Sequence, residues 1–131
     1  RPVNKPNTIA KSLAIGNPAD GYYSAKVMRE SGGWGENVTD EEIISAMKLM
    51  AETEGIFAET AGGVTLGSTI KLIESGRISR DESIVICVTG NGLKTQEALA
   101  GKINQPTIIN ARLQEFDDLV KAAGKEYAVK A

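Results

Sequence analysis

The sequence predicts an α/β fold in which helices cover a mostly parallel sheet, and three observations support this prediction. Residues 84–88 are five apolar, mostly β-branched residues in a row, a pattern typical of a strand buried on both faces. Helical and short extended patterns alternate along the chain, as they do in α/β proteins. A polar, glycine-rich turn follows the strand directly, and ligands of such sheets bind just beyond the carboxyl ends of the strands. Thr89, the first residue of that turn, is therefore the first candidate site residue.

Composition narrows the classes of function. The 131 residues carry 15 basic and 17 acidic side chains and only 5% aromatic residues, so no nucleic-acid surface is expected. No run of about 20 apolar residues occurs that could cross a membrane. One cysteine excludes an internal disulfide, which, with no leader-like start, favours a cytoplasmic protein. Without histidine, the sequence offers no Ser-His or Cys-His catalytic pair and no ordinary zinc site.

Both ends of the sequence suggest a piece of a longer natural protein. It begins with Arg1-Pro2 rather than Met, and residues 126–131 start an alternating, strand-like pattern. Residues 1–104 are expected to form the α/β unit. Residues 105–131 are expected to be a C-terminal extension with one helix, and whether a further domain starts there is left open.

The first predicted helix follows the Asn17-Pro18 turn and runs from about residue 19 to residue 30. The glycines at 32 and 33 end it. Its apolar side is weak, with Tyr22, Tyr23 and Val27, so it should lie on the surface.

The clearest local signal starts the second helix. Thr39 can cap it, and Glu42, three residues on, can reach back to the cap amide. Because capping and the helix dipole explain the acidic residues 40–42, we prefer this interpretation to a metal site. One buried stripe follows, ended by Gly55 and made of Ile43, Ile44, Met47, Met50 and Ala51.

The third predicted helix begins near Glu59, carries Leu66, Ile70 and Ile73 on its apolar side, and ends at Gly76. Glycine inside a helix costs about 1 kcal/mol relative to alanine, and this helix contains three glycines, at 62, 63 and 67. Either the helix packs very closely on the sheet, or its first backbone amides face a cofactor. The residues alone leave both accounts open.

The last third of the chain is predicted as a short helix over 95–100, an extended segment over 106–109 and a final helix capped by Asn110 and ended by Gly124. Leu113, Phe116 and Leu119 form the apolar side of that helix.

Two nucleotide-binding motifs are rejected in the turn GNGLKT at 90–95. Leu93 separates Gly92 from Lys94, which breaks the phosphate-loop pattern, and Thr95 stands where a dinucleotide fingerprint needs its third glycine. Cys87 is expected to be an inert core thiol. Lys94 is expected to be solvated rather than to form an imine.

Three segments of the chain, taken in this order and spacing, form a specific combination: TIAKSLAIGNP at 8–18, EGIFAETAGG at 54–63 and VTGNGLK at 88–94. They resemble the C-terminal part of the threonine synthase family. These are pyridoxal-phosphate enzymes of the tryptophan-synthase-β-like fold (fold type II). The resemblance covers residues 1–101, and the combination of its first and last segments is specific.

The resemblance implies conversion of O-phosphohomoserine and water to threonine and phosphate, in a homodimer that uses pyridoxal phosphate. It implies cofactor-binding roles for four residues. The Thr89 hydroxyl would bond the pyridine nitrogen, the backbone of Ser12 and Leu13 would pack on one ring face, and Glu59 would lie near the ring edge.

The resemblance also implies what this chain lacks. The family's Schiff-base lysine and phosphate-binding loop belong to the earlier, N-terminal half of the enzyme. We therefore expect no catalytic residue in this fragment and no activity from it alone. There are two alternatives. The chain could be a fragment of a related threonine or serine dehydratase, or a non-catalytic binding or regulatory module of the same fold. The isolated chain should self-associate or be stabilised by the missing half.

Overall fold

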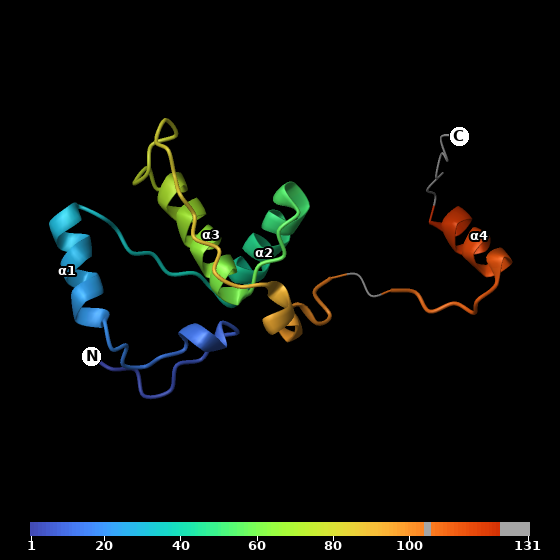
Figure 1. Cartoon of the computed structure of the whole chain (residues 1–131), viewed down its shortest axis with the longest axis horizontal. Coiled ribbons are helices and arrows are strands. Elements are labelled where there is room, and N and C mark those ends of the chain that lie inside the picture. Colours follow the sequence, from blue (N-terminus) through green and yellow to red (C-terminus); the bar gives the residue numbers. More distant parts are fainter. Residues whose placement is uncertain (104–105, 124–131) are drawn as a thin grey trace.

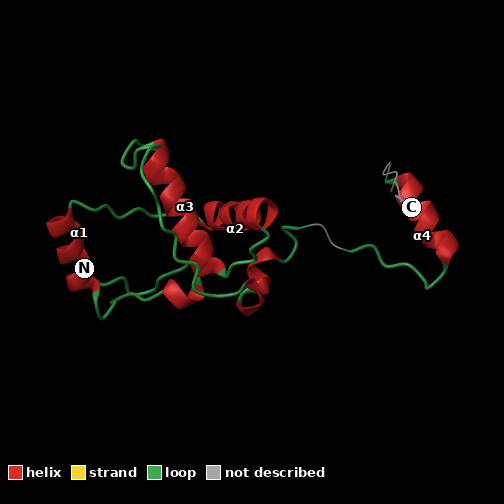
Figure 2. Ribbon diagram, turned by 45° about the horizontal axis from the view of Figure 1, so that its top comes forward, coloured by secondary structure: helices red, strands yellow, loops and turns green. Residues whose placement is uncertain are grey.

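The computed structural model describes residues 1–103 and 106–123 (Figure 1). Its α-helices are α1 (Gly21–Ser31), α2 (Asp40–Glu54), α3 (Thr60–Glu74) and α4 (Leu113–Ala122). Short 3₁₀ turns form η1 (Lys11–Leu13), η2 (Gly92–Lys94) and η3 (Gln96–Leu99). Within these described residues there is no β-strand, as Figure 2 shows, and only an isolated antiparallel bridge joins Ala58 to Asn91.

The predicted buried strand at 84–88 is wrong for this chain taken by itself. The segment carries no regular structure, and its side chains are open to solvent, with Val85 90% exposed and Ile84 42% exposed. Cys87 is likewise exposed and not a core thiol. A strand needs neighbouring backbone to pair its N–H and C=O groups, and no described segment pairs with this one. The apolar pattern is present, but the sheet that would bury it is not.

The core lies where α2 and α3 pack together with the segment around η1. Its buried members, which come from distant parts of the chain, are Ala10, Ile43, Met47 and Leu99. Half-buried apolar side chains pack around them: Ile9, Val38, Ile44, Phe57 and Val64. The core therefore ties the N-terminal segment and the 92–99 region to the helix pair.

The predicted start and end of α2 are confirmed. The Glu42 N–H donates to Thr39 Oγ1 (3.2 Å), and the Thr39 N–H donates to the Glu42 carboxylate (2.6 Å). Gly55 ends the helix with φ +68°, a left-handed conformation that suits glycine. The predicted stripe is partly corrected. Ile43, Met47 and Met50 are buried, but Ala51 is exposed and Ala46 takes its place, because α3 crosses α2 on the side of Ala46.

Close packing explains two glycines of α3, Gly63 against α2 and Gly67 against the connection that precedes α2. A Cβ built on Gly63 would lie 2.7 Å from Met47 Cγ and 2.9 Å from Ile43 Cγ2. On Gly67 it would lie 3.0 Å from Val38 Cγ1. Of the two accounts left open by the sequence, the packing account holds for these positions. The partner is helix α2 for Gly63 and Val38, in the connection before α2, for Gly67. The helix ends before Gly76, which has φ +71°.

The outer helices follow the local signals less completely. Helix α1 confirms the predicted surface helix: Gly32 ends it with φ +71°, and Tyr22 and Tyr23 are exposed. Helix α4 exists, but Arg112 occupies its cap position, and Asn110 instead bonds the Glu115 carboxylate through its backbone and side-chain N–H groups. In Figure 1, α4 is drawn apart from the α2–α3 pair. The predicted stop at Gly124 and the pattern at 126–131 lie outside the described residues.

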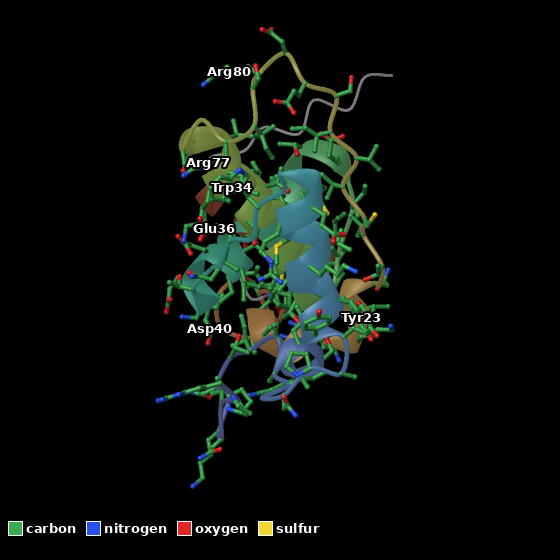
Figure 3. All side chains as sticks on the ribbon, turned by 90° about the vertical axis from the view of Figure 1, so that its left-hand side faces the viewer. Tyr23, Trp34, Glu36, Asp40, Arg77 and Arg80 are labelled. Atoms are coloured by element: carbon green, nitrogen blue, oxygen red, sulfur yellow. The ribbon has the colours of Figure 1, made fainter. Side chains whose placement is uncertain are left out.

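A stacked pair links the α1–α2 connection to the end of α3. The guanidinium carbon of Arg77 lies 3.6 Å from the ring centroid of Trp34, a cation–π geometry (Figure 3). In the last turn of α3, the Lys71 ammonium donates to the backbone carbonyl of Asn37 (2.9 Å). These two contacts hold the connection 33–38 beside the C-terminal end of α3.

Candidate functional site

The turn that begins at Thr89 is held against residues 57–59 by backbone hydrogen bonds. The Glu59 N–H donates to the Gly90 carbonyl (3.0 Å), and the Gly92 N–H donates to the Phe57 carbonyl (2.8 Å). The structure thus brings the candidates Thr89 and Glu59, 30 positions apart in sequence, to the same place. Thr89 is exposed there, so its hydroxyl is open to a ligand.

The two glycines of this turn are required by contacts within the chain. A Cβ on Gly90 would collide with the Glu59 carboxylate, and a Cβ on Gly92 would collide with the Phe57 ring. The space beside these two glycines is therefore filled by side chains of the same chain. The shape of this turn therefore depends on the position of Glu59.

Glu59 sits at the N-cap position of α3 and is 9% exposed. Its carboxylate benefits from the positive end of the helix dipole and lies 3.8 Å from the ammonium nitrogen of Lys94. Because the Lys94 side chain is 67% exposed, that ion pair is weak. The expectation of a solvated Lys94 holds, with a loose contact to Glu59.

The start of α3 has two features that sequence reasoning missed. Thr95 Oγ1 accepts a hydrogen bond from the Thr60 N–H (3.1 Å), which joins the turn after Thr89 to the helix. The Thr60 hydroxyl is fully buried and has no hydrogen-bond partner among the described residues. Neither feature has a local sequence signal, since residues 60 and 95 meet only in the fold.

The other two candidates, Ser12 and Leu13, lie on η1. Both side chains are exposed, with Leu13 at 50%, while Ala10 directly before the turn is 1% exposed in the core. The turn is closed by hydrogen bonds from the Leu13 N–H to the Ala10 carbonyl (2.9 Å) and from the Ala14 N–H to the Lys11 carbonyl (3.2 Å). η1 also contacts α3, the helix that Glu59 caps.

Asp40 ties the segment before η1 to the start of α2. One of its carboxylate oxygens accepts from the Thr8 hydroxyl (2.7 Å) and from the Ile9 N–H (3.1 Å). The hydrogen bond from Thr8, followed by that from Ile9, holds the pKa of Asp40 below its ordinary value. The sequence interpreted Asp40 as one of several carboxylates at a helix start, and only the fold shows its separate partners.

Comparison with known proteins adds the decisive observation. Residues 1–90 match the family profile described as "Pyridoxal-phosphate dependent enzyme". The chain belongs to this family. It is 40% identical over 120 residues to a threonine synthase of Methanocaldococcus jannaschii. The aligned residues make up 92% of this chain and 30% of that protein. It is 36% identical over 124 residues to a threonine synthase of Methanosarcina acetivorans, covering 95% of this chain and 31% of that protein.

A third relative agrees with these two. A threonine synthase of Bacillus sp. (strain ULM1) is 39% identical over 121 residues, covering 91% of this chain and 34% of that protein. The chain thus spans about a third of the length of the curated relatives that it matches. The predicted resemblance to threonine synthases is confirmed.

Membership in the family implies pyridoxal phosphate as the cofactor and the tryptophan-synthase-β-like fold. The described residues, which lack strands, do not confirm the parallel sheet of that fold. The side chains present fit this cofactor chemically. The exposed neutral hydroxyl of Thr89, on a turn held by backbone hydrogen bonds, can bond a pyridine nitrogen without protonating it. The half-exposed Leu13 offers apolar surface to a planar ring.

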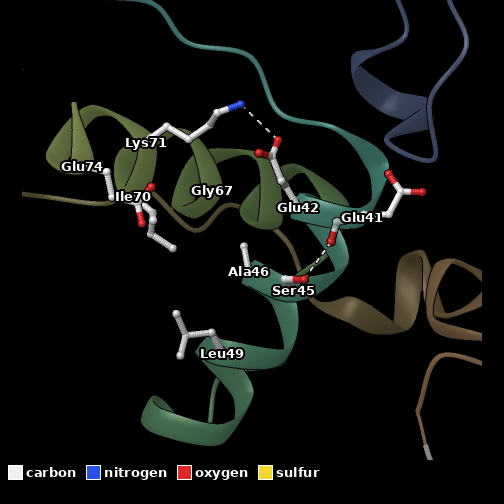
Figure 4. Close-up of a pocket in the computed structure, with 9 residues that line it drawn as sticks. All are labelled: Glu41, Glu42, Ser45, Ala46, Leu49, Gly67, Ile70, Lys71 and Glu74. Carbon is white, nitrogen blue, oxygen red and sulfur yellow. Dashed lines mark hydrogen bonds and ion pairs between the residues drawn. The ribbon is translucent and has the colours of Figure 1, made fainter.

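The groove between α2 and α3 is separate from these residues. Its volume is about 330 Å³, and its lining includes Ala46, Gly67 and the Glu42–Lys71 pair (Figure 4). None of the four candidate residues lines it.

The described part of the chain holds no cluster of three or more residues suited to a metal ion. Among its helices, none combines the length and apolar character needed to cross a membrane.

Proposed function

We propose that this chain is a C-terminal part of a threonine synthase, a lyase that converts O-phosphohomoserine and water to threonine and phosphate. The observation that carries this proposal is the 36–40% identity to three threonine synthases over at least 91% of the chain. Because the chain spans about a third of those relatives, other residues would supply the Schiff-base lysine and the phosphate-binding loop. The chain alone would then be inactive.

Each candidate residue has a distinct role in this proposal. Bound pyridoxal phosphate would serve as the electron sink while protons leave the α and β carbons and the γ phosphate departs. The Thr89 hydroxyl bonds the pyridine nitrogen and, being neutral, moderates the sink. The backbone of Ser12 and Leu13 packs on one ring face. Glu59 lies near the ring edge and sets the shape of the Thr89 turn through its contact with Gly90.

The test uses the full-length protein that carries these residues. Purified with pyridoxal phosphate, it should show the visible absorbance of the bound cofactor and release phosphate from O-phosphohomoserine. Thr89→Ala should lower turnover, whereas Thr89→Ser, which keeps the hydroxyl, should retain most of it. Unchanged turnover in Thr89→Ala would remove Thr89 from the site. Consumption of threonine in place of O-phosphohomoserine would indicate a dehydratase, and absence of cofactor binding a non-catalytic module.

A homodimer is part of the same proposal. Separately, the exposed segment 83–88 supports association of the isolated chain. Its apolar side chains, Val85 above all, are in water in the isolated chain. We expect the isolated chain to self-associate in sedimentation experiments, and the full-length protein to sediment as a dimer. A well-behaved monomer of the isolated chain would contradict the first expectation.

A further inference from the structure

Asp40 controls the path of the chain into η1. The same Asp40 oxygen accepts two hydrogen bonds, from the Thr8 hydroxyl and the Ile9 N–H. Thr8 Oγ1 in turn accepts from the Ala10 N–H (3.2 Å). The Asp40 carboxylate thereby fixes Thr8 and Ile9 directly and Ala10 through Thr8. Ala10 is buried and stands at the N-cap position of η1.

The bonds of Asp40 differ from those of its acidic neighbours. Thr39 and Glu42 form the capping box of α2 without Asp40, and Glu42 also bonds Lys71. Glu41 is exposed. Capping of α2 therefore leaves the Asp40 carboxylate free for the N-terminal segment. A hydrogen bond to a charged acceptor is stronger than a neutral one, which suits an anchor at a half-buried position.

We propose that Asp40 is a positioning residue for cofactor binding: through Thr8, Ile9 and Ala10 it holds the Ser12-Leu13 turn in place against the ring of pyridoxal phosphate. This inference rests on the proposed function, which puts that turn at the ring. Asp40 itself touches neither cofactor nor substrate. Its effect is to set the position and rigidity of backbone that does.

The experiment compares four variants of the full-length protein. Asp40→Ala removes the acceptor, and Asp40→Asn keeps an acceptor oxygen while removing the charge. Glu41→Ala removes a neighbouring exposed carboxylate from the same helix turn. Met50→Ala destabilises the fold at a buried residue of α2 that lies outside the core cluster of Ala10, Ile43, Met47 and Leu99. The readouts are the dissociation constant of pyridoxal phosphate, the visible circular dichroism of the bound cofactor and hydrogen exchange of amides 9–14.

Asp40→Ala should bind pyridoxal phosphate about tenfold more weakly, which corresponds to about 1.4 kcal/mol. It should also change the visible dichroism and lose amide protection over 9–14. Asp40→Asn should recover most of the affinity, and Glu41→Ala and Met50→Ala should resemble the unchanged protein in both cofactor readouts. Wild-type affinity and dichroism in Asp40→Ala would overturn the inference, with or without loss of amide protection. Failure of the unchanged protein to bind pyridoxal phosphate would instead overturn the proposed function.

Discussion

The ammonium group of Lys71 on α3 lies 3.1 Å from the carboxylate of Glu42 on α2 (Figure 4). The same Glu42 oxygen accepts the N–H of Thr39 and so also closes the capping box. One carboxylate therefore completes the start of one helix and joins it to the next. Local capping and tertiary packing meet in this side chain.

Acid should weaken the chain through Glu42. The hydrogen bond from the Thr39 backbone, followed by that from Lys71, lowers the pKa of Glu42. A carboxyl whose pKa is lower in the folded state stabilises the fold above its unfolded pKa. That stabilisation is lost as the pH falls through the lowered folded value. We expect the melting temperature to decrease as the pH is lowered below about 4.5. Glu42→Gln should make the melting temperature depend less on pH in this range. Melting temperatures measured from pH 7 to pH 3 test this, with the exposed Glu52→Gln as control.

Thr39→Ala should lower the free energy of unfolding by about 1 kcal/mol, because it removes the side-chain acceptor of the capping box. Thr53→Ala is the matched control. The Thr53 hydroxyl donates to the Leu49 carbonyl on an exposed face of the same helix, so this change should alter stability little. Urea denaturation of both variants gives the comparison. Equal decreases in the free energy of unfolding for the two variants would show that the Thr39 cap adds no more stability than an exposed threonine inside the helix.

Gly63→Ala should destabilise the α2–α3 pair by about 1–3 kcal/mol, although alanine favours helix by about 1 kcal/mol. The added methyl group would press against Met47 and the backbone carbonyl of Ile43. Gly21→Ala on α1 is the control, since its nearest neighbour, Pro18 Cγ, would lie at an ordinary 3.5 Å. Urea denaturation measures both variants. A stabilised Gly63→Ala protein would refute the close packing.

Gly90→Ala and Glu59→Ala should be strongly non-additive. The methyl group of Gly90→Ala collides with the Glu59 carboxylate, and Glu59→Ala removes that obstacle. In a double-mutant cycle on the full-length protein, the cost of Gly90→Ala should fall by about 0.5–3 kcal/mol when Glu59 is already alanine. Additive changes in unfolding free energy would mean that Glu59 does not set the shape of the Thr89 turn.

Helix starts and stops were predictable because their signals are local. The Thr39–Glu42 box lies within four residues, and Gly55 ends its helix through its own backbone freedom. The same rule failed at Asn110, whose side chain bonds Glu115 while Arg112 takes the cap position. Among the candidate site residues, Thr89 was proposed from the apolar run and the turn after it, whereas Ser12, Leu13 and Glu59 were proposed through the family resemblance. Thr89 and Glu59 come together by backbone pairing between distant segments, which no local pattern reports.

The sequence by itself determined the start and end of α2 and the family, since short-range hydrogen bonding and shared motifs decide these. Tertiary structure alone decided which surface each residue meets. It assigned Gly63 to a neighbouring helix, Gly90 to a carboxylate and Asp40 to the N-terminal segment. It also left residues 84–88 in water. Burial and steric contact depend on chain segments far away in sequence, so an apolar run shows a tendency to be covered but not what covers it.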